Sequence, residues 1–226
     1  MSDQASPQTA DAAGVPRLPF PPTLVAVAGC SGSGKTTLAD ELARTLGGLR
    51  FHLDDYYLDL GHLPFDERVK KNFDDPAMIE VPLMAAHIRA LARGEILERP
   101  VYDFATYTRV PNRTETIRPG QLLIVEGIFA LYYPELLPHY HLRVFIDAPD
   151  GLCFERRLKR DMVERGRTEQ SVRSQYDSTV RPSSLAFIRP SAANADLIVD
   201  GTGSLDWKVE RVLTEMRRRR LLAHGS

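Results

Sequence analysis

The chain has 226 residues, a formal net charge of −1 at pH 7, and a composition that is 43% hydrophobic and 26% charged. These values fit one large or two small globular domains and argue against a general polyanion binder, although they leave room for a local basic patch. The apolar runs are far shorter than the roughly 18 residues of a membrane span, and the two cysteines, Cys30 and Cys153, cannot form a disulfide framework. Because the N-terminus shows no basic-then-apolar leader pattern, we expect a cytoplasmic protein.

The chain is expected to consist of a tail followed by a single domain. Residues 1–22 are rich in Ser, Ala, Gln and Pro, which predicts a disordered N-terminal tail, and no linker or repeat divides residues 23–226. Short apolar runs typical of strands buried on both faces are Leu24–Ala28, Leu49–Leu53, Leu122–Val125, Leu142–Ile146 and Leu197–Val199. Apolar residues at helical spacing lie from Lys35 to Leu46, from Pro82 to Gly94 and from Leu205 to Met216, and a charged stretch from about 150 to 180 is also expected to be helical.

Residues 97–117 have a different pattern from the rest of the domain. Val101–Tyr107 and Arg109–Ile117 are rich in β-prone residues, and Val110-Pro111-Asn112 is typical of a turn, so we expect a β-hairpin insertion here. Elsewhere, strands alternate with amphipathic helices. The predicted fold is therefore a three-layer α/β/α domain with a parallel sheet of about five strands.

A phosphate-binding motif follows the first predicted strand. The string Gly29-Cys30-Ser31-Gly32-Ser33-Gly34-Lys35-Thr36 fits G-x-x-x-x-G-K-[ST] and opens a predicted helix, which is the context that the motif requires. Its backbone N–H groups and the helix N-terminus would converge on a phosphate, and Lys35 would reach the β- and γ-phosphates. The Thr36 hydroxyl would be a ligand of Mg²⁺. The alternative is a Gly/Ser-rich turn without a ligand; the motif in this context predicts a nucleoside triphosphate site.

Missing motifs narrow the kind of P-loop protein. The sequence has neither the N-K-x-D motif of a GTPase nor the L-S-G-G-Q signature of an ABC ATPase. Arginines gather at about 156–175, which favours a small-molecule kinase with an Arg-rich lid over the alternative of a solvated helix face. Arg157 and Arg160 share a helix face, and Arg165-Gly166-Arg167 would break that helix with two guanidiniums close together.

Two carboxylates at predicted strand ends are candidate catalytic groups. Asp54 follows the second strand at the edge where open α/β sheets place their ligands, and it could orient and deprotonate an attacking hydroxyl. Glu126 directly follows Leu122–Val125, where a carboxylate can hold Mg²⁺ directly or through water. The alternative for each is a solvated surface acid.

Together these residues resemble the uridine–cytidine kinase family of P-loop nucleoside kinases. The similarity is collinear over about residues 23–200. The strings that carry it are Gly29–Thr37, Asp54–Tyr57, 72–76 (NFDDP), 100–104 (PVYDF), 125–128 (VEGI), 156–161 (RRLKRD), 164–167 (ERGR), 175–176 (QY) and 188–196 (IRP to AD).

The resemblance implies ATP-dependent phosphorylation of the 5′-hydroxyl of uridine or cytidine, a pyrimidine salvage reaction that uses Mg²⁺. It implies that Asp54 and Lys35 are catalytic and that Thr36 and Glu126 serve the metal. The implied ATP-binding residues are Gly29, Cys30, Ser31, Gly32, Ser33, Gly34, Lys35, Thr36, Thr37, Arg160, Arg165 and Arg167. Besides Asp54, the implied nucleoside-binding residues are Tyr57, Phe73, Asp74, Tyr102, Tyr107, Arg157 and Gln175. Asp74, Arg157 and Gln175 would hold the ribose hydroxyls, so deoxyribose should be a poor substrate. A homotetramer and feedback inhibition by CTP or UTP are further implications.

Two positions depart from the family's pattern. Tyr107 stands where the family usually has His, at the position that faces the 4-substituent of the pyrimidine, and we expect it to favour cytidine, whose amino group can donate to the phenolic oxygen. Gly151-Leu152-Cys153 lacks an Arg that the family tends to show, which leaves ATP and GTP both open as donors. Cys30 would be sensitive to oxidation if the helix dipole lowered the pKa of its thiol.

Two alternatives to this function remain at this point. One is another small-molecule kinase on the same frame, similar to pantothenate kinase or ribulose-phosphate kinase. The other is a nucleotide-sensing regulator without turnover, for which Arg217–Arg220 offers an anionic-surface contact; the alternative for that run is a helix C-terminus with favourable charge.

Overall fold

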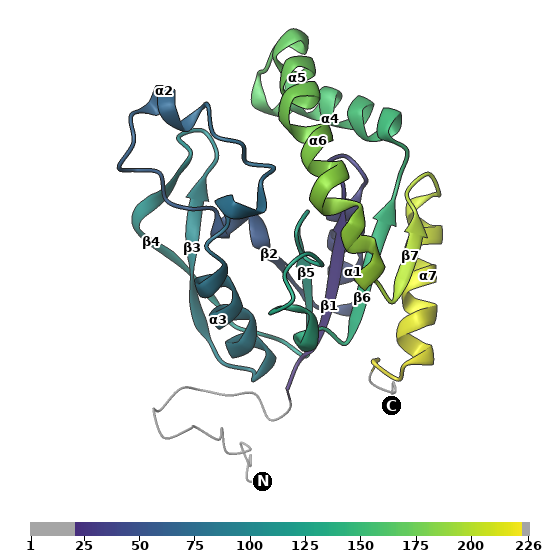
Figure 1. Ribbon diagram of the computed structural model, residues 1–226. Helices are drawn as coiled ribbons and strands as arrows, with labels where there is room; N and C mark the ends of the chain where they lie inside the picture. The colour runs from purple at the N-terminus through teal and green to yellow at the C-terminus, as the bar shows by residue number, and fades with distance from the viewer. Residues whose placement is uncertain (1–20, 223–226) are drawn as a thin grey trace.

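A parallel five-stranded sheet with the strand order β2-β5-β1-β6-β7 forms the centre of the molecule (Figure 1). The computed structural model describes residues 21–222, so residues 1–20 of the expected tail lie outside the described residues. The strands are β1 (Thr23–Gly29), β2 (Leu49–His52), β5 (Leu122–Glu126), β6 (Leu142–Asp147) and β7 (Leu197–Asp200). The predicted strands are confirmed, and their ends differ from the prediction by one residue.

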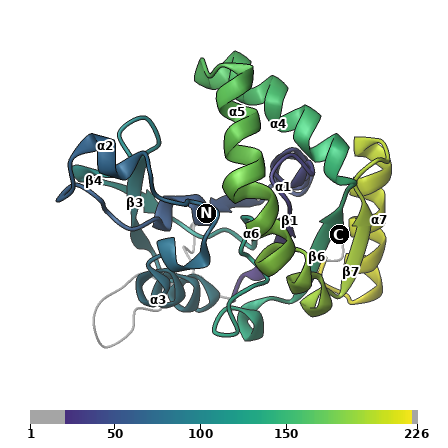
Figure 2. The ribbon, with the colours of Figure 1, turned by 45° about the horizontal axis from the view of Figure 1, so that its top comes forward.

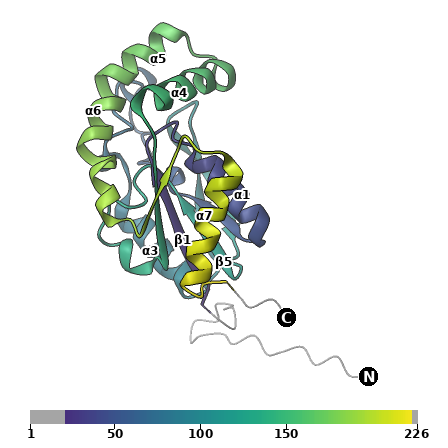
Figure 3. The same ribbon diagram turned by 90° about the vertical axis from the view of Figure 1, so that its right-hand side faces the viewer.

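Helices cover both faces of the sheet (Figure 3). They include α1 (Lys35–Leu46), α3 (Val81–Ala92) and α7 (Leu205–Arg218). Side chains alternate along β1, so that Val25 and Val27 face α1 and α7, whereas Leu24 and Ala26 face α3 on the opposite side. Each face therefore has its own buried apolar cluster, as expected for a parallel sheet between two helical layers. Within residues 21–222, no helix is both long and apolar enough to cross a membrane.

Local sequence accounts for the ends of these helices. Gly47 ends α1 with a φ of 63°, a left-handed conformation that glycine adopts without steric cost. Pro82 lies in the first turn of α3, where a missing N–H leaves no hydrogen bond unmade. Ser204 precedes α7 and accepts a hydrogen bond from the backbone N–H of Trp207. All three helices begin within one residue of the predicted position.

The predicted hairpin is present, but its turn was predicted in the wrong place. The strands β3 (Leu97–Asp103) and β4 (Thr108–Ile117) form a separate two-stranded antiparallel sheet, and residues 104–107 make the turn. Asp103 stabilises this turn by accepting hydrogen bonds from Ala105 N–H at 2.9 Å and from the Thr106 hydroxyl at 2.8 Å. Val110-Pro111-Asn112 instead lies inside β4 as a bulge, with Asn112 at a φ of 56°. Asn tolerates this left-handed conformation in a bulge as readily as in a turn.

The charged stretch that the sequence predicts as helical forms the lid. The lid and the hairpin lie on opposite sides of the molecule's centre (Figure 2). It consists of α4 (Asp150–Arg165), α5 (Glu169–Gln175) and α6 (Arg181–Ser183), the last flanked by π-helical turns at Tyr176–Val180 and Ser184–Ile188. The predicted break is confirmed, because α4 ends at Gly166 with a φ of 61°. The short helix α2 (Phe65–Arg68) lies outside the predicted helices.

Candidate active site

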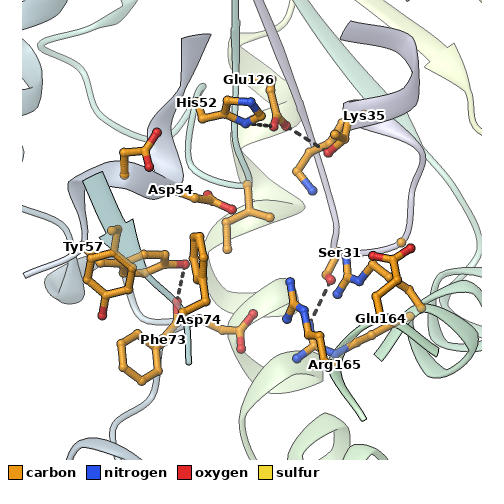
Figure 4. Close-up of a pocket in the computed structure, with 18 of the residues that line it drawn as sticks. Ser31, Lys35, His52, Asp54, Tyr57, Phe73, Asp74, Glu126, Glu164 and Arg165 are labelled. Atoms are coloured by element: carbon orange, nitrogen blue, oxygen red, sulfur yellow. Dashed lines mark hydrogen bonds and ion pairs between the residues drawn. The ribbon is translucent and has the colours of Figure 1, made fainter. Parts of the chain in front are cut away.

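A pocket of about 1,290 Å³ lies at the carboxyl ends of β1, β2 and β5, between the hairpin and the lid (Figure 4). Most of the residues that the sequence assigns to a site line this one cavity. They are Ser31, Gly32, Gly34, Lys35, Thr36, Thr37, Asp54, Tyr57, Phe73, Asp74, Tyr102, Tyr107, Glu126, Arg157, Arg160, Arg165, Arg167 and Gln175. The fold thus brings together segments that are up to about 140 residues apart in sequence.

The P-loop connects β1 to α1 in a conformation that depends on glycine. Gly32 and Gly34 have φ values of 85° and 97°, in the left-handed region that side chains rarely adopt. A Cβ atom on Gly32 would lie 2.2 Å from the carbonyl oxygen of Cys153, because the loop packs directly on the backbone of α4. The loop is therefore held between the sheet and the base of the lid, with its outer face toward the pocket.

Three residues of the P-loop that were predicted to bind ATP do not line the pocket. They are Gly29, Cys30 and Ser33, which are buried on the side of the loop away from the pocket. The backbone N–H of Ser33 donates to the Cys30 carbonyl at 3.0 Å, which closes the turn of the loop. The Cys30 sulfur lies 3.0 Å from the Ser184 hydroxyl, and burial raises the pKa of this thiol. The condition for the expected oxidation of Cys30, a lowered thiol pKa, is therefore not met, because desolvation outweighs the charges that would favour a thiolate.

Glu126 and Thr36 place two side-chain oxygens next to each other beside the P-loop. The Thr36 hydroxyl donates to one Glu126 oxygen at 3.3 Å, and the other Glu126 oxygen lies 2.8 Å from Nδ1 of His52. Although burial opposes it, the contact with His52 and the charge of Lys35 hold the pKa of Glu126 below its usual range. An ionised carboxylate beside a hydroxyl suits a small hard cation such as Mg²⁺ when the nucleotide supplies further oxygens. Among residues 21–222, no group of three His, Cys, Asp or Glu could hold a metal by itself.

His52 is a site residue that the sequence analysis missed. It ends β2, and the parallel register pairs it directly with Glu126 on β5. The sequence pattern alone does not give that register. The only signal in the sequence is a histidine two residues before Asp54.

Asp54 lies in the 3₁₀ turn η1 (Leu53–Tyr56), directly after β2, and its carboxylate projects into the pocket near Lys35 (Figure 4). Burial raises the pKa of Asp54 to about 6, and the nearby Glu126 charge adds to the rise, while Lys35 opposes it. A carboxylate with a raised pKa accepts a proton more readily than an ordinary aspartate and is still ionised at neutral pH. These properties are those of a general base.

Aromatic rings line the side of the pocket formed by the hairpin. Phe73 stacks on Tyr107 with a centroid distance of 4.9 Å and packs edge-to-face on Tyr57 at 5.5 Å. Tyr102 lies 5.5 Å from Tyr57, so the rings make a continuous wall. The Tyr57 hydroxyl donates to the Phe73 carbonyl at 2.9 Å, so this group holds the wall together in the free protein. Tyr107 ends the hairpin turn with a φ of 57°.

Asp74, Arg157 and Gln175 occupy the floor between this wall and the P-loop. The Arg157 guanidinium donates to the Ser31 hydroxyl and to the Gln175 side-chain oxygen, both at 2.9 Å. Asp74 is 7% exposed, and burial raises its pKa while the charge of Arg157 opposes the rise. A buried carboxylate, a guanidinium and an amide offer both acceptors and donors to a vicinal diol.

The lid arginines converge on a single buried carboxylate. Asp161 is fully buried and lies 2.8 Å from Arg160, 3.6 Å from Arg165 and 3.7 Å from Arg167. The sequence predicts roles for these arginines, but none for Asp161 or Arg156. The Arg156 guanidinium donates to the carbonyls of Ser33 at 3.2 Å and Gly201 at 3.3 Å, and so joins the P-loop to the loop before α7.

Taken together, one side of the pocket can bind polyphosphate and the other can bind a flat ring and a diol, with a base between them. The arginines and Lys35 offer positive charge to phosphate groups, and Asp54 offers a carboxylate that could accept a proton in the same pocket. This arrangement suits phosphoryl transfer from a nucleotide to an alcohol.

Comparisons with known proteins agree with this chemistry. A model of the phosphoribulokinase/uridine kinase family matches residues 24–207. The uridine kinase of Chloroflexus aggregans is 43% identical over 200 residues, which cover 85% of this chain and 95% of that protein. The uridine kinase of Deinococcus deserti is 42% identical over 200 residues, with coverages of 85% and 96%.

Solved structures show the same fold. A putative fructose transport system kinase from Silicibacter sp. TM1040 has a TM-score of 0.64 at 23% identity over 81% of this chain and 92% of that one. Phosphoribulokinase from Rhodobacter spheroides has a TM-score of 0.56 at 13% identity, with coverages of 79% and 70%.

Proposed function

The chain belongs to the phosphoribulokinase/uridine kinase family, and on this premise we propose that it phosphorylates the 5′-hydroxyl of a pyrimidine ribonucleoside with ATP. The observation that carries the proposal is the position of Asp54. This partly buried carboxylate, with its pKa raised to about 6, lies between the P-loop lysine and the aromatic wall of the same pocket. A base at that place can receive the proton of a hydroxyl that attacks a phosphate held by the P-loop.

In the proposed reaction, the P-loop backbone and Lys35 hold the β- and γ-phosphates of ATP. Asp54 accepts the proton of the 5′-hydroxyl while the hydroxyl oxygen bonds to the γ-phosphorus. The bond between the γ-phosphorus and the β–γ bridging oxygen breaks at the same time. Arg160, Arg165 and Arg167 neutralise charge on the transferring group, for which they leave their contacts with Asp161. ADP and a nucleoside 5′-monophosphate are the products.

We propose Mg²⁺ as the cofactor, held by Thr36 and Glu126. The contact of 3.3 Å between their oxygens supports this assignment, because both offer hard oxygen ligands at one point of the pocket. When bound, the ion neutralises charge on the phosphate oxygens. His52 keeps the second Glu126 oxygen oriented through its contact at 2.8 Å.

The proposed acceptor is a ribonucleoside because three polar groups, two of them buried, meet on the pocket floor. Asp74, Arg157 and Gln175 would bind the 2′- and 3′-hydroxyls of ribose. A deoxynucleoside leaves part of this set unpaired in a desolvated place, which commonly costs a factor of about 10⁴ in discrimination.

Tyr107 is proposed to set the preference between the two pyrimidines. Its ring stacks on Phe73, which places the phenol at the edge of the aromatic wall. The amino group of cytosine can donate to the phenolic oxygen, and we therefore propose that cytidine is the better substrate.

A panel of phosphoryl acceptors tests the proposed function. Wild-type protein and Asp54→Asn are incubated with Mg²⁺ and either ATP or GTP, and with uridine, cytidine, deoxycytidine, pantothenate or ribulose 5-phosphate. We expect ADP release that depends on uridine or cytidine and is lost in Asp54→Asn. Turnover with pantothenate or ribulose 5-phosphate alone would assign another kinase activity. ATP binding without acceptor-dependent turnover would support the nucleotide-sensing alternative.

A further inference from the structure

Arg99 is a buried cation for which the proposed reaction has no use. It lies on β3, is 8% exposed, and lines the pocket. One end of its guanidinium is 2.9 Å from the Asp55 carboxylate, and the other end pairs with Glu115 on β4. The guanidinium lies 5.4 Å from the ring centre of Phe51, at the end of β2. Arg99 therefore contacts both strands of the hairpin and the segment that carries the candidate base.

Asp55 is the neighbour of Asp54 in the turn η1. Its side chain is 16% exposed and also accepts a hydrogen bond from the backbone N–H of Tyr102. Burial raises the pKa of Asp55, and the charge of Arg99 opposes that rise. Because Asp55 takes two contacts from β3, a shift of the hairpin must move the turn that holds Asp54 or break these contacts.

The hairpin is not part of the main sheet, so it needs side-chain contacts of this kind to hold its position. β3 and β4 pair only with each other, so no backbone ladder fixes them relative to β2 and the P-loop. A second arginine link lies two residues further along, at Tyr57. Arg109 on β4 donates to the Tyr57 carbonyl at 3.3 Å and pairs with Glu80 at 2.6 Å. An ion pair at Asp55 and a hydrogen bond at the Tyr57 carbonyl thus join the hairpin to the segment from Asp54 to Tyr57.

We propose that Arg99 and Asp55 are positioning residues for the acceptor: their ion pair holds the hairpin, with Tyr102 and Tyr107, at a fixed place relative to Asp54. This inference rests on the proposed function, because it takes the hairpin to be the nucleoside-binding wall. The donor side consists of the P-loop and the lid, with which Arg99 makes no recorded contact among residues 21–222. Breaking the pair should therefore impair use of the nucleoside and leave ATP binding intact.

The test compares Arg99→Met, Asp55→Asn, their double variant, Arg99→Lys and the control Arg113→Met, which removes an exposed arginine from the same strand pair. KM for uridine and cytidine, KM for ATP, kcat and Tm are measured for each. In Arg99→Met we expect KM for the nucleoside to rise about tenfold, the loss typical of one charge-assisted contact, with KM for ATP within about twofold of wild type. Arg99→Lys keeps the charge and should recover at least half of the loss on a logarithmic scale. Arg113→Met should match wild type.

The double variant keeps the test informative if Arg99→Met unfolds. It removes both charges, so neither is left buried alone, and it should fold and show the same selective rise in nucleoside KM. Equal rises in the KM of nucleoside and ATP, or a fall in Tm with no change in either KM, would overturn the proposal. If wild-type protein fails to phosphorylate any nucleoside, the proposed function fails first; if wild type is active and the variants lack the split, only the positioning role fails.

Discussion

Replacing Asp54 with Asn should stabilise the protein at pH 8, and the gain should fade as the pH is lowered. Asp54 is partly buried near Glu126, and its ionised form is desolvated in the folded protein. In the unfolded chain the same carboxylate is in water. Ionisation of Asp54 therefore works against folding, and a neutral amide of the same shape removes that cost.

The size of the effect follows from the pKa. Burial raises the pKa of Asp54 from 3.8 to about 6, a difference worth about 3 kcal/mol at 1.36 kcal/mol per pH unit. Because the folded pKa is the higher one, the folded state binds the proton more tightly. Protonated Asp54 therefore favours the folded state. This contribution to the free energy of unfolding is fully present below pH 3.8, declines between pH 3.8 and about 6, and is absent at higher pH.

Urea unfolding at pH 8 and pH 4.5, without nucleotide or divalent cation, measures the difference. The free energy of unfolding of Asp54→Asn should exceed that of wild type by about 3 kcal/mol at pH 8 and by about 1 kcal/mol at pH 4.5. The matched control is Asp66→Asn, which makes the same substitution at an exposed aspartate of α2. An equal gain at both pH values, or a loss of stability at pH 8, would refute the reasoning.

Four further predictions follow from the same geometry. The kcat/KM of the wild type should fall about tenfold per unit below about pH 6, because protonated Asp54 cannot act as a base; a flat profile down to pH 5 would contradict this. Glu126→Gln should raise the Mg²⁺ concentration needed for half-maximal activity by about tenfold or more, measured by titration at saturating ATP. Tyr107→His should lower the ratio of kcat/KM for cytidine to that for uridine, and equal ratios in both proteins would exclude a role in base preference. Gly32→Ala should cost about 3 kcal/mol or more in unfolding experiments and abolish ATP binding, because its Cβ would lie 2.2 Å from a backbone oxygen; Gly47→Ala, with open space around it, should cost only about 1 kcal/mol.

Features that depend on residues adjacent in the sequence were predictable from the sequence. The P-loop needs only its own glycines, Lys35 and the flanking strand and helix, so its place and shape follow from a single string. Asp54 and Glu126 were each predicted as candidate catalytic groups because each directly follows an apolar strand. The order of the strands and the contact of Glu126 with Thr36 came from the structure.

Features that depend on long-range register or on bulges were not predictable. His52 contacts Glu126 because β2 pairs with β5 in one particular register. Pro111-Asn112 has the composition of a turn, yet Asp103 stabilises a turn earlier in the hairpin and leaves the later pair as a bulge. Asp161 is an acid among many charged residues in the sequence, and only the folded lid reveals that it is fully buried among arginines. In each case a partner distant in space decides the role.

The most direct test of the proposed reaction compares wild-type protein with Asp54→Asn in formation of uridine or cytidine 5′-monophosphate, identified by phosphorus NMR, and measures ATP affinity in parallel. If Asp54 is the base for the 5′-hydroxyl, kcat for the 5′-monophosphate should fall by a factor of about 10² to 10⁴ while the Kd for ATP stays within about threefold of wild type. A product phosphorylated elsewhere, or an Asp54→Asn variant with kcat within threefold of wild type, would contradict it.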